Sequence, residues 1–218
     1  MPQTGPFVSS EVEKRVTARA RLASRLRLKR TVLGVVAVSF ALTGCIRFGA
    51  EPPKSLLRLT PAEQVAPGTG QTVAPGEAIT IFPPSVPAEL ANTRIPVRTG
   101  TSVAYVKEAQ WVEPPNRLFQ RLLSDVVAAR TGRPVLSGRQ FTVDPGMRIT
   151  GQLQAFGVDE AARNAVVTYD AVAIRGTDVR TRRFEARVPV AEIETAAVGT
   201  ALNQAANQVA AEVADWVK

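Results

Sequence analysis

The chain's only cysteine, Cys45, follows an apolar run that is itself preceded by a strongly basic segment. The basic segment carries eight Lys and Arg against two Glu before residue 31, and residues 31–44 contain no charged side chain. This order is typical of a secretory signal, and 14 residues are too few for a spanning helix, which needs about 20. We therefore predict that residues 1–44 are a targeting segment and that only the remainder contributes to the fold.

The residues Leu42-Thr43-Gly44-Cys45 resemble the lipobox of bacterial lipoproteins, in which the cysteine becomes the first mature residue and carries the lipid. This resemblance implies that Cys45 is lipidated and anchors the chain in a membrane. Each buried methylene of such acyl chains contributes about 0.8 kcal/mol. Ile46, not aspartate, follows the cysteine. In the sorting pattern of these lipoproteins this implies the outer membrane, with the protein facing the periplasm.

The charge distribution and the missing residue types exclude several functions. The whole chain has a net charge of +8, but residues 1–44 account for +6 of it. The remaining 19 basic and 17 acidic side chains give only +2, so there is no electrostatic reason to expect nucleic-acid binding. The chain has no histidine and one cysteine, which excludes intrachain disulfides, Cys/His zinc sites and Ser-His-Asp triads. Because glycine-rich phosphate loops are also absent, we expect no enzyme activity, cofactor or metal ion.

Proline separates a predicted tether from a predicted domain. Eight of the 16 prolines fall between Pro52 and Pro87, so residues 45–76 are predicted to carry the lipid on Cys45 and to form a flexible tether. Within the tether, residues 56–59 are largely apolar and would add an edge strand. Residues 77–218 remain for one folded domain, and 142 residues are enough for a single core.

The hydrophobic pattern predicts an α/β (α+β) domain. Alternating apolar and polar residues predict strands over 78–82, 94–98, 102–106, 148–155, 166–174 and 183–190. Pro96 lacks an amide hydrogen, which favours an edge position for the second of these strands. Apolar stripes of helical period predict helices over 116–130 and 195–217, with an N-cap at Asn116 and an end at Gly132 for the first. We expect a curved, mostly antiparallel sheet with two amphipathic helices.

Three groups of residues are candidates for binding, and each has a purely structural alternative. One side of the helix over 195–217 carries amides, either as a solvated face or as a contact surface without net charge: Asn203, Gln204, Asn207 and Gln208. Four arginines surround one predicted hairpin turn, either as a solvated tip or as a contact to lipid phosphates or an acidic partner: Arg175, Arg180, Arg182 and Arg183. Tyr105, Trp111 and the Glu113-Pro114-Pro115 run form either core and a turn into a helix, or a binding surface.

Several short motifs resemble those of the ABC-type transport auxiliary lipoproteins, a family that includes the lipoprotein component of paraquat-inducible, MCE-type lipid transport systems. The resemblance covers about residues 45–218, and its most specific part is Gln-Trp-Val-Glu-Pro-Pro at 110–115 before a leucine-rich helix. The other motifs are the lipobox, Leu56-Leu57-Arg58-Leu59, Arg94-Ile95 with Tyr105, the strand containing Phe156, and Asp215-Trp216.

This resemblance implies a mixed α/β domain and a non-catalytic partner of a lipid transport system, anchored in the outer membrane. The implied partners are an MCE-domain protein and the ABC permease and ATPase of the same system, and a homo-oligomer is compatible with this role. The competing hypothesis is a structural envelope lipoprotein that binds peptidoglycan or an outer-membrane assembly complex.

Overall fold

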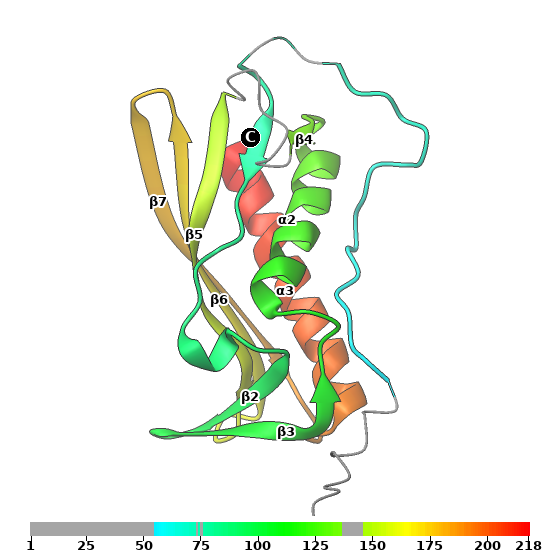
Figure 1. The fold of residues 1–218 in the computed structure, drawn as a ribbon, viewed down its shortest axis with the longest axis vertical. Helices are drawn as coiled ribbons and strands as arrows, with labels where there is room; N and C mark the ends of the chain where they lie inside the picture. The colour runs from blue at the N-terminus through cyan, green and yellow to red at the C-terminus, as the bar shows by residue number, and fades with distance from the viewer. Residues whose placement is uncertain (1–54, 73, 75, 137–145) are drawn as a thin grey trace, which may run out of the picture. The chain divides into compact units, whose positions relative to one another are not determined.

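A computed structural model describes residues 55–72, 74, 76–136 and 146–218, which belong to one compact unit (Figure 1). The predicted signal segment, residues 1–44, and Cys45 lie outside the described residues. The described part is an α+β domain with a seven-stranded sheet and two α-helices. Its elements in chain order are β1 (Ile79–Ile81), the 3₁₀ helix η2 (Ala88–Leu90), β2 (Arg94–Thr99), β3 (Ser102–Gln110), α2 (Pro115–Thr131), β4 (Val135–Leu136), β5 (Met147–Asp159), β6 (Asn164–Arg175), β7 (Asp178–Pro189) and α3 (Thr195–Val217).

Strands β5, β6 and β7 form a long antiparallel meander, as the alternating pattern predicted. β5 and β6 pair from Met147↔Arg175 to Asp159↔Asn164, and β6 pairs with β7 over the same length. The two turns of the meander lie at 160–163 and 176–177. The strands predicted over 94–98 and 102–106 are confirmed as β2 and β3, which form an antiparallel hairpin with its turn after Thr99.

The prediction of a mostly antiparallel sheet is wrong, because the sheet is mixed. β1 pairs in parallel with both β4 and the start of β5, and β2 pairs in parallel with the end of β5. The edge of β5 that faces away from β6 is therefore shared between two short strands, with a single bridge from Ser85 to Gln152 between them. Alternation identifies a strand but carries no information about the direction of its neighbour, so the pattern did not reveal these parallel pairs.

The prediction that Pro96 places its strand at an edge is also wrong. β2 lies between β3 and β5, and β3 occupies the edge. The ladder between β2 and β5 begins only at Val97, and the register with β3 shifts between Arg94 and Pro96. Pro96 therefore lies outside the ladder with β5, where its missing N–H removes no hydrogen bond to that strand. Gly157 makes the close approach possible, since a Cβ there would lie 2.4 Å from the Pro96 carbonyl oxygen.

Helix α2 begins and ends at residues that its sequence explains. Pro114 is the N-cap residue and Pro115 occupies the first turn, where a missing N–H has no helical partner to lose. The predicted N-cap, Asn116, instead lies inside the helix. The helix ends at Gly132, as predicted, with a left-handed φ of 68° and its N–H donated to the Ala128 carbonyl.

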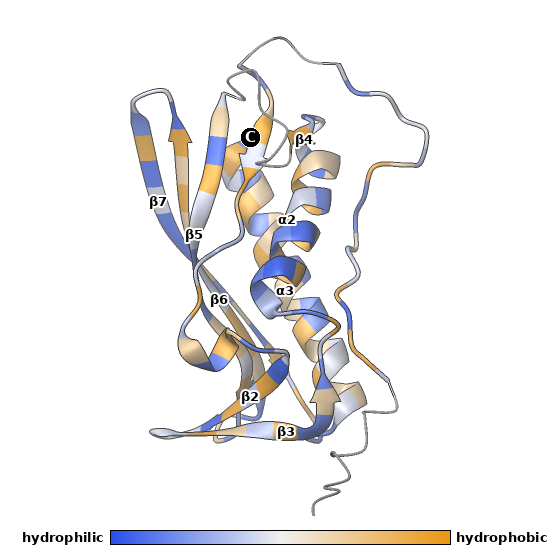
Figure 2. Cartoon of the chain, in the orientation of Figure 1, coloured by the Kyte–Doolittle hydropathy of each residue, from blue (hydrophilic) through white to orange (hydrophobic). Residues whose placement is uncertain are grey.

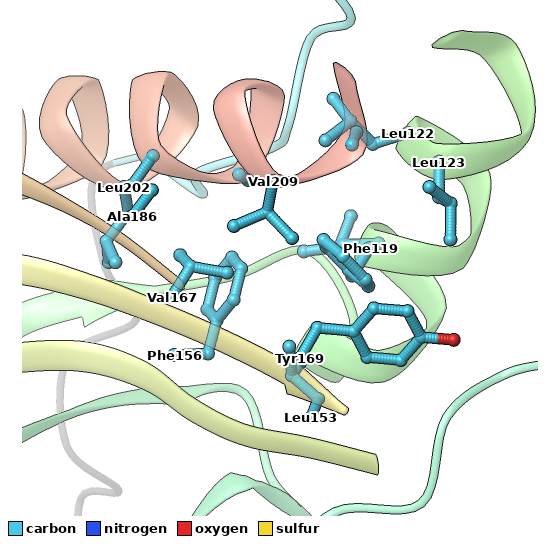
Figure 3. Packing of buried hydrophobic residues seen from close by; sticks show 14 of the residues in the cluster. Phe119, Leu122, Leu123, Leu153, Phe156, Val167, Tyr169, Ala186, Leu202 and Val209 are labelled. Carbon is cyan, nitrogen blue, oxygen red and sulfur yellow. The ribbon is translucent and has the colours of Figure 1, made fainter. Parts of the chain in front are cut away.

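Both helices cover one face of the sheet, and the core lies between the two layers (Figures 1 and 3). In Figure 2, hydrophobic and hydrophilic residues alternate along both helices. The hydrophobic residues of both helices that are buried belong to the same core as those of the sheet. From α2, Phe119 meets Tyr169 of β6 edge to face, with ring centroids 5.1 Å apart. The Tyr169 hydroxyl donates to the Thr150 carbonyl at 2.9 Å, and burial raises the pKa of Tyr169 well above its usual range.

Helix α3 is buried on two sides, because it packs on the sheet and also against α2. Small side chains make this possible, since they allow neighbouring backbones to approach closely. The buried alanines of α3 are Ala201, Ala205, Ala206, Ala210 and Ala214.

Candidate interaction surfaces

Part of the predicted tether is bound to the domain. Residues 57–63, which we call the arm, run from the end of β3 along α3. The Leu57 amide donates to the Gln110 carbonyl at 2.7 Å, and the Val112 amide donates to the Leu57 carbonyl at 2.9 Å. The Leu57 side chain packs over Gly199 of α3, where a Cβ would lie 3.0 Å from Leu57 Cδ2. The predicted extra strand at 56–59 is thus reduced to one parallel bridge, between Leu57 and Trp111.

Two asparagines of α3 bind the backbone of the arm. The Thr60 amide donates to Asn203 Oδ1 at 2.8 Å, and the Ala62 amide donates to Asn207 Oδ1 at 2.7 Å. Asn207 Nδ2 donates in return to the Thr60 carbonyl at 3.0 Å. Four residues of a helix rise about 6 Å, and two residues of an extended chain rise roughly 6.6 Å. Asparagines four positions apart can therefore match backbone groups two positions apart.

An arginine holds the far end of the arm. Arg130 of α2 contacts Glu63 of the arm at 2.7 Å and Asp215 of α3 at 2.9 Å, so one guanidinium joins three segments. The hydrogen bonds that Arg130 donates to Glu63 raise the pKa of Arg130 above its usual range. Glu63 and Asp215 are exposed and Arg130 is only partly buried, so solvent screening weakens both ion pairs.

The four predicted amides do not form one surface. Asn203 and Asn207 are half-buried beneath the arm, whereas Gln204 and Gln208 are exposed. Gln204 borders an open groove between α3 and the end of β7, which Val188 and Val190 also line. The arm therefore covers one half of the predicted contact surface, Asn203 and Asn207. The other half, Gln204 and Gln208, faces solvent.

The four predicted arginines are also divided, because alternate residues of β7 face opposite sides of the sheet. Arg183 pairs with Asp170 at 2.6 Å, and this interaction holds the pKa of the Asp170 carboxyl below its usual range. Arg180 lies over the Trp216 ring at 5.1 Å, and Arg182 lies over the Phe184 ring at 5.0 Å. Arg180 also lines an open pocket of about 600 Å³ beside the end of α3; its other charged lining residues are Arg175, Asp178 and Lys218.

Trp111 belongs to the core, which confirms the structural interpretation of that residue. It is 1% exposed, and its ring meets Phe156 edge-on at a centroid distance of 5.5 Å. Its Nε1 has no hydrogen-bond partner among residues 55–72, 74, 76–136 and 146–218. Glu113 pairs with Arg121, and Tyr105 lies half-exposed beneath Arg94, whose guanidinium carbon is 3.8 Å from the ring centroid.

The outer face of the sheet carries a small pocket that the sequence pattern did not indicate. Its volume is about 150 Å³, and its polar lining includes Thr168, Glu185 and Arg187. Glu185 accepts hydrogen bonds from Arg187 Nε at 2.8 Å and from Thr168 Oγ1 at 2.9 Å, and these bonds lower its pKa. Three of the polar side chains that line this pocket, Thr168, Glu185 and Arg187, are thus joined through the Glu185 carboxylate.

Searches for metal sites and membrane spans gave no candidates in the described part of the chain. No group of three or more His, Cys, Asp or Glu side chains there is arranged to hold a metal ion. None of the helices described is both long and apolar enough to cross a membrane.

The sequence interpretation named Asn203 and Asn207 as candidate contact residues but missed the arm that they bind. A signal was present: Gly199, Asn203 and Asn207 repeat every four residues and so lie in one row along α3. Nothing in that row identifies its partner, which lies more than 140 residues away in the chain. The role of Arg130 could not be predicted either, because both of its acidic partners, Glu63 and Asp215, come from distant segments of the sequence.

Comparison with solved structures supports the fold. A crystal structure of an uncharacterized protein is 12% identical, covering 68% of this chain and 97% of that one, with a TM-score of 0.59. Protein XCC0632 from Xanthomonas campestris, of family DUF330, is 22% identical over 75% of this chain and 94% of that one, also at 0.59. The PelC dodecamer from Paraburkholderia phytofirmans matches at a TM-score of only 0.33, with 10% identity over 66% of this chain and 94% of that one.

Comparison with protein families is more specific. No curated protein matches the chain. One family model, described as ABC-type transport auxiliary lipoprotein component, matches residues 56–214. This match begins at the arm, covers every strand and both helices, and ends within the last turn of α3. The chain therefore belongs to the family of ABC-type transport auxiliary lipoprotein components.

Proposed function

We propose that this auxiliary component is anchored in the outer membrane by lipid on Cys45, faces the periplasm and serves an MCE-type ABC lipid transport system. In this role the domain binds the other components and catalyses no reaction. The observation that carries the proposal is the arm. Leu57 follows Cys45 by only twelve residues, so the lipid anchor is tied closely to a surface of the domain. Such a connection suits a component that holds partners near a membrane.

The proposed docking surface combines the exposed amides of α3 with the neighbouring arginines of β7. Gln204 and Gln208 offer hydrogen bonds without net charge, and they remain exposed while Asn203 and Asn207 bind the arm. Among the strands that the structure describes, β7 pairs only with β6, so its outer edge also offers backbone groups to a partner. Arg180 and Arg182 lie on the helix side of this strand and extend the surface toward the β6–β7 turn.

The test is co-purification of the full chain from envelope membranes, with the bound proteins identified by mass spectrometry. We expect the MCE-domain protein together with the ABC permease and ATPase. Recovery of peptidoglycan or outer-membrane assembly proteins in their place would favour the structural envelope role.

A pair of substitutions tests the docking surface itself. Gln204→Lys combined with Gln208→Lys places two charges on the proposed contact and should reduce the recovered partner several-fold. Gln152→Lys is the matched control, because Gln152 is an exposed glutamine on β5, away from α3 and β7. Equal recovery from both proteins would contradict this choice of surface.

A further inference from the structure

We infer that one particular end of the domain contacts the lipid bilayer. That end, which we call the near end, consists of the β2–β3 hairpin, the start of α3 and residues 56–58; the β6–β7 turn points away from the bilayer. The inference rests on the proposed lipidation of Cys45. It adds an orientation and a bilayer-contacting surface, which neither the fold nor the family match specifies.

The near end and the β6–β7 turn lie at opposite ends of the sheet. The hairpin joins the sheet through Val97↔Val158, at the end of β5, whereas the β6–β7 turn adjoins Met147 at its start. Eleven residues of strand separate Met147 from Val158, which corresponds to roughly 36 Å. Figure 1 shows the same arrangement, with β2 and β3 at the bottom and the turn between the yellow and brown strands at the top.

The arm brings the lipid anchor to the near end. Leu57 is fixed beside Trp111 and Gly199, and Gly199 lies in the second turn of α3. Twelve residues separate Leu57 from Cys45, so their Cα atoms lie at most about 43 Å apart. This limit is close to the length of β5. The β6–β7 turn reaches the bilayer only when the chain between Cys45 and Leu57 runs almost straight along the domain. The near end reaches the bilayer in most conformations of that stretch.

The near end also presents the side chains that a bilayer surface would bind. Leu56 is 50% exposed, Val112 is 47% exposed and Val103 on the hairpin is 43% exposed. Leu56 and Val112 are neighbours, because the Val112 amide donates to the Leu57 carbonyl. Apolar side chains at the level of the headgroups lose contact with water, and this stabilises the contact. Exposed Arg58, Arg94 and Lys107 add positive charge. Exposed Glu108 and Glu194, the N-cap residue of α3, largely offset it, so the contact depends mainly on apolar residues.

The chain's single cysteine makes a direct experiment possible. In the lipidated protein Cys45 is blocked, so a cysteine introduced elsewhere carries the only thiol. Ser102→Cys, on the hairpin, and Thr177→Cys, in the β6–β7 turn, are both exposed positions. Each variant, purified in full length with its lipid, is labelled with an environment-sensitive fluorophore and placed in phosphatidylethanolamine–phosphatidylglycerol vesicles that contain a nitroxide-labelled lipid.

We expect the nitroxide lipid to lower the fluorescence at position 102 roughly twofold or more, because interfacial contact places the label within about 10 Å of the headgroups. Fluorescence at position 177 should stay unchanged. Leu56→Ser combined with Val112→Ser should reduce the quenching at 102 while the protein stays on the vesicles.

Two results would overturn the orientation alone: stronger quenching at 177 than at 102, or no quenching at either position in protein that sediments with the vesicles. Protein that fails to associate with the vesicles would overturn the proposed lipid anchoring, and the orientation with it. Sedimentation and quenching are separate measurements, so the two failures are distinguishable.

Discussion

Trp111 occupies a position where three parts of the chain meet. Its backbone bridges to Leu57, its amide donates to the Thr93 carbonyl at 2.8 Å, and its ring packs on Phe156. Removing the ring leaves a cavity that this many fixed neighbours cannot fill. We predict that Trp111→Ala lowers the free energy of unfolding by about 3–5 kcal/mol, measured by chemical denaturation.

Trp111→Phe is the informative companion variant. It keeps one aromatic ring and removes an indole N–H that has no partner among the described residues, and a buried unpaired donor costs about 1–3 kcal/mol. The smaller phenylalanine ring fills less of the core, which destabilises the domain, while removal of the unpaired N–H stabilises it. Because these two effects partly cancel, Trp111→Phe should lower the free energy of unfolding clearly less than Trp111→Ala. An alanine variant that melts like the natural protein but no longer binds its partner would refute the core role.

Asp170 gives a prediction about acid stability. Its carboxylate accepts hydrogen bonds from Arg183 Nε at 2.6 Å and from Gln154 Nε2 at 3.0 Å, which lowers its pKa in the folded state. A lowered folded pKa stabilises the domain above the pKa of an unfolded aspartate, about 3.9, and this contribution disappears as the pH falls through the folded pKa.

The variant Asp170→Asn should therefore be less stable than the natural protein near pH 7, and the difference should shrink below about pH 4. Because Arg183 is 64% exposed, solvent screens this ion pair and the difference at neutral pH should be small. Urea unfolding near pH 7 and near pH 3 measures it, with Asp178→Asn at the start of β7 as control. A difference that persists unchanged at pH 3 would contradict this assignment.

At the scale of elements, hydrogen bonds with Asn203 and Asn207 of α3 help to hold the arm on the domain. We predict that Asn203→Ala combined with Asn207→Ala releases it, because three hydrogen bonds to the Thr60 and Ala62 backbone are lost. At about 0.5 kcal/mol or more per bond, the amides of the arm should exchange with deuterium roughly tenfold faster. Gln204→Ala combined with Gln208→Ala is the matched control on the other side of α3. Identical exchange in both proteins would show that Leu57 and Arg130 suffice to hold the arm.

The elements that could be predicted are those whose own residues determine them. The α2 stripe from Leu118 to Val127 and the alternation of β5 to β7 are local patterns, and both were recognised correctly. Strand β4 has two residues, too few for any period to show. The parallel partners of β1, the interior position of β2 and the binding of the arm depend on segments far apart in the sequence. Local periodicity does not encode those contacts, so the candidate surface on α3 was found but its division between arm and solvent was not.

At the scale of the whole molecule, the first prediction concerns the anchor. If Cys45 carries the lipid, Cys45→Ser should leave an unlipidated precursor held at the inner membrane. Mass spectrometry of the mature natural protein should show a modified cysteine as its first residue. An unmodified Cys45, or cleavage at another site, would refute lipidation and also the short connection between the membrane and the arm.

The last prediction concerns how the domain recognises its partner. The chain from Cys45 onward has a net charge of only +2, and the proposed docking surface is centred on the uncharged Gln204 and Gln208. Salt at 0.1 M screens exposed charges beyond about 10 Å, which weakens contacts made by ion pairs but leaves amide hydrogen bonds and apolar contacts largely unchanged. A pull-down of the MCE-domain partner should therefore change little between low and moderate salt, and Gln204→Lys with Gln208→Lys should reduce it several-fold at both. If salt removes the binding and the lysine variant retains it, the contact lies instead at Arg180 and Arg182, where charge and not hydrogen bonding would select the partner.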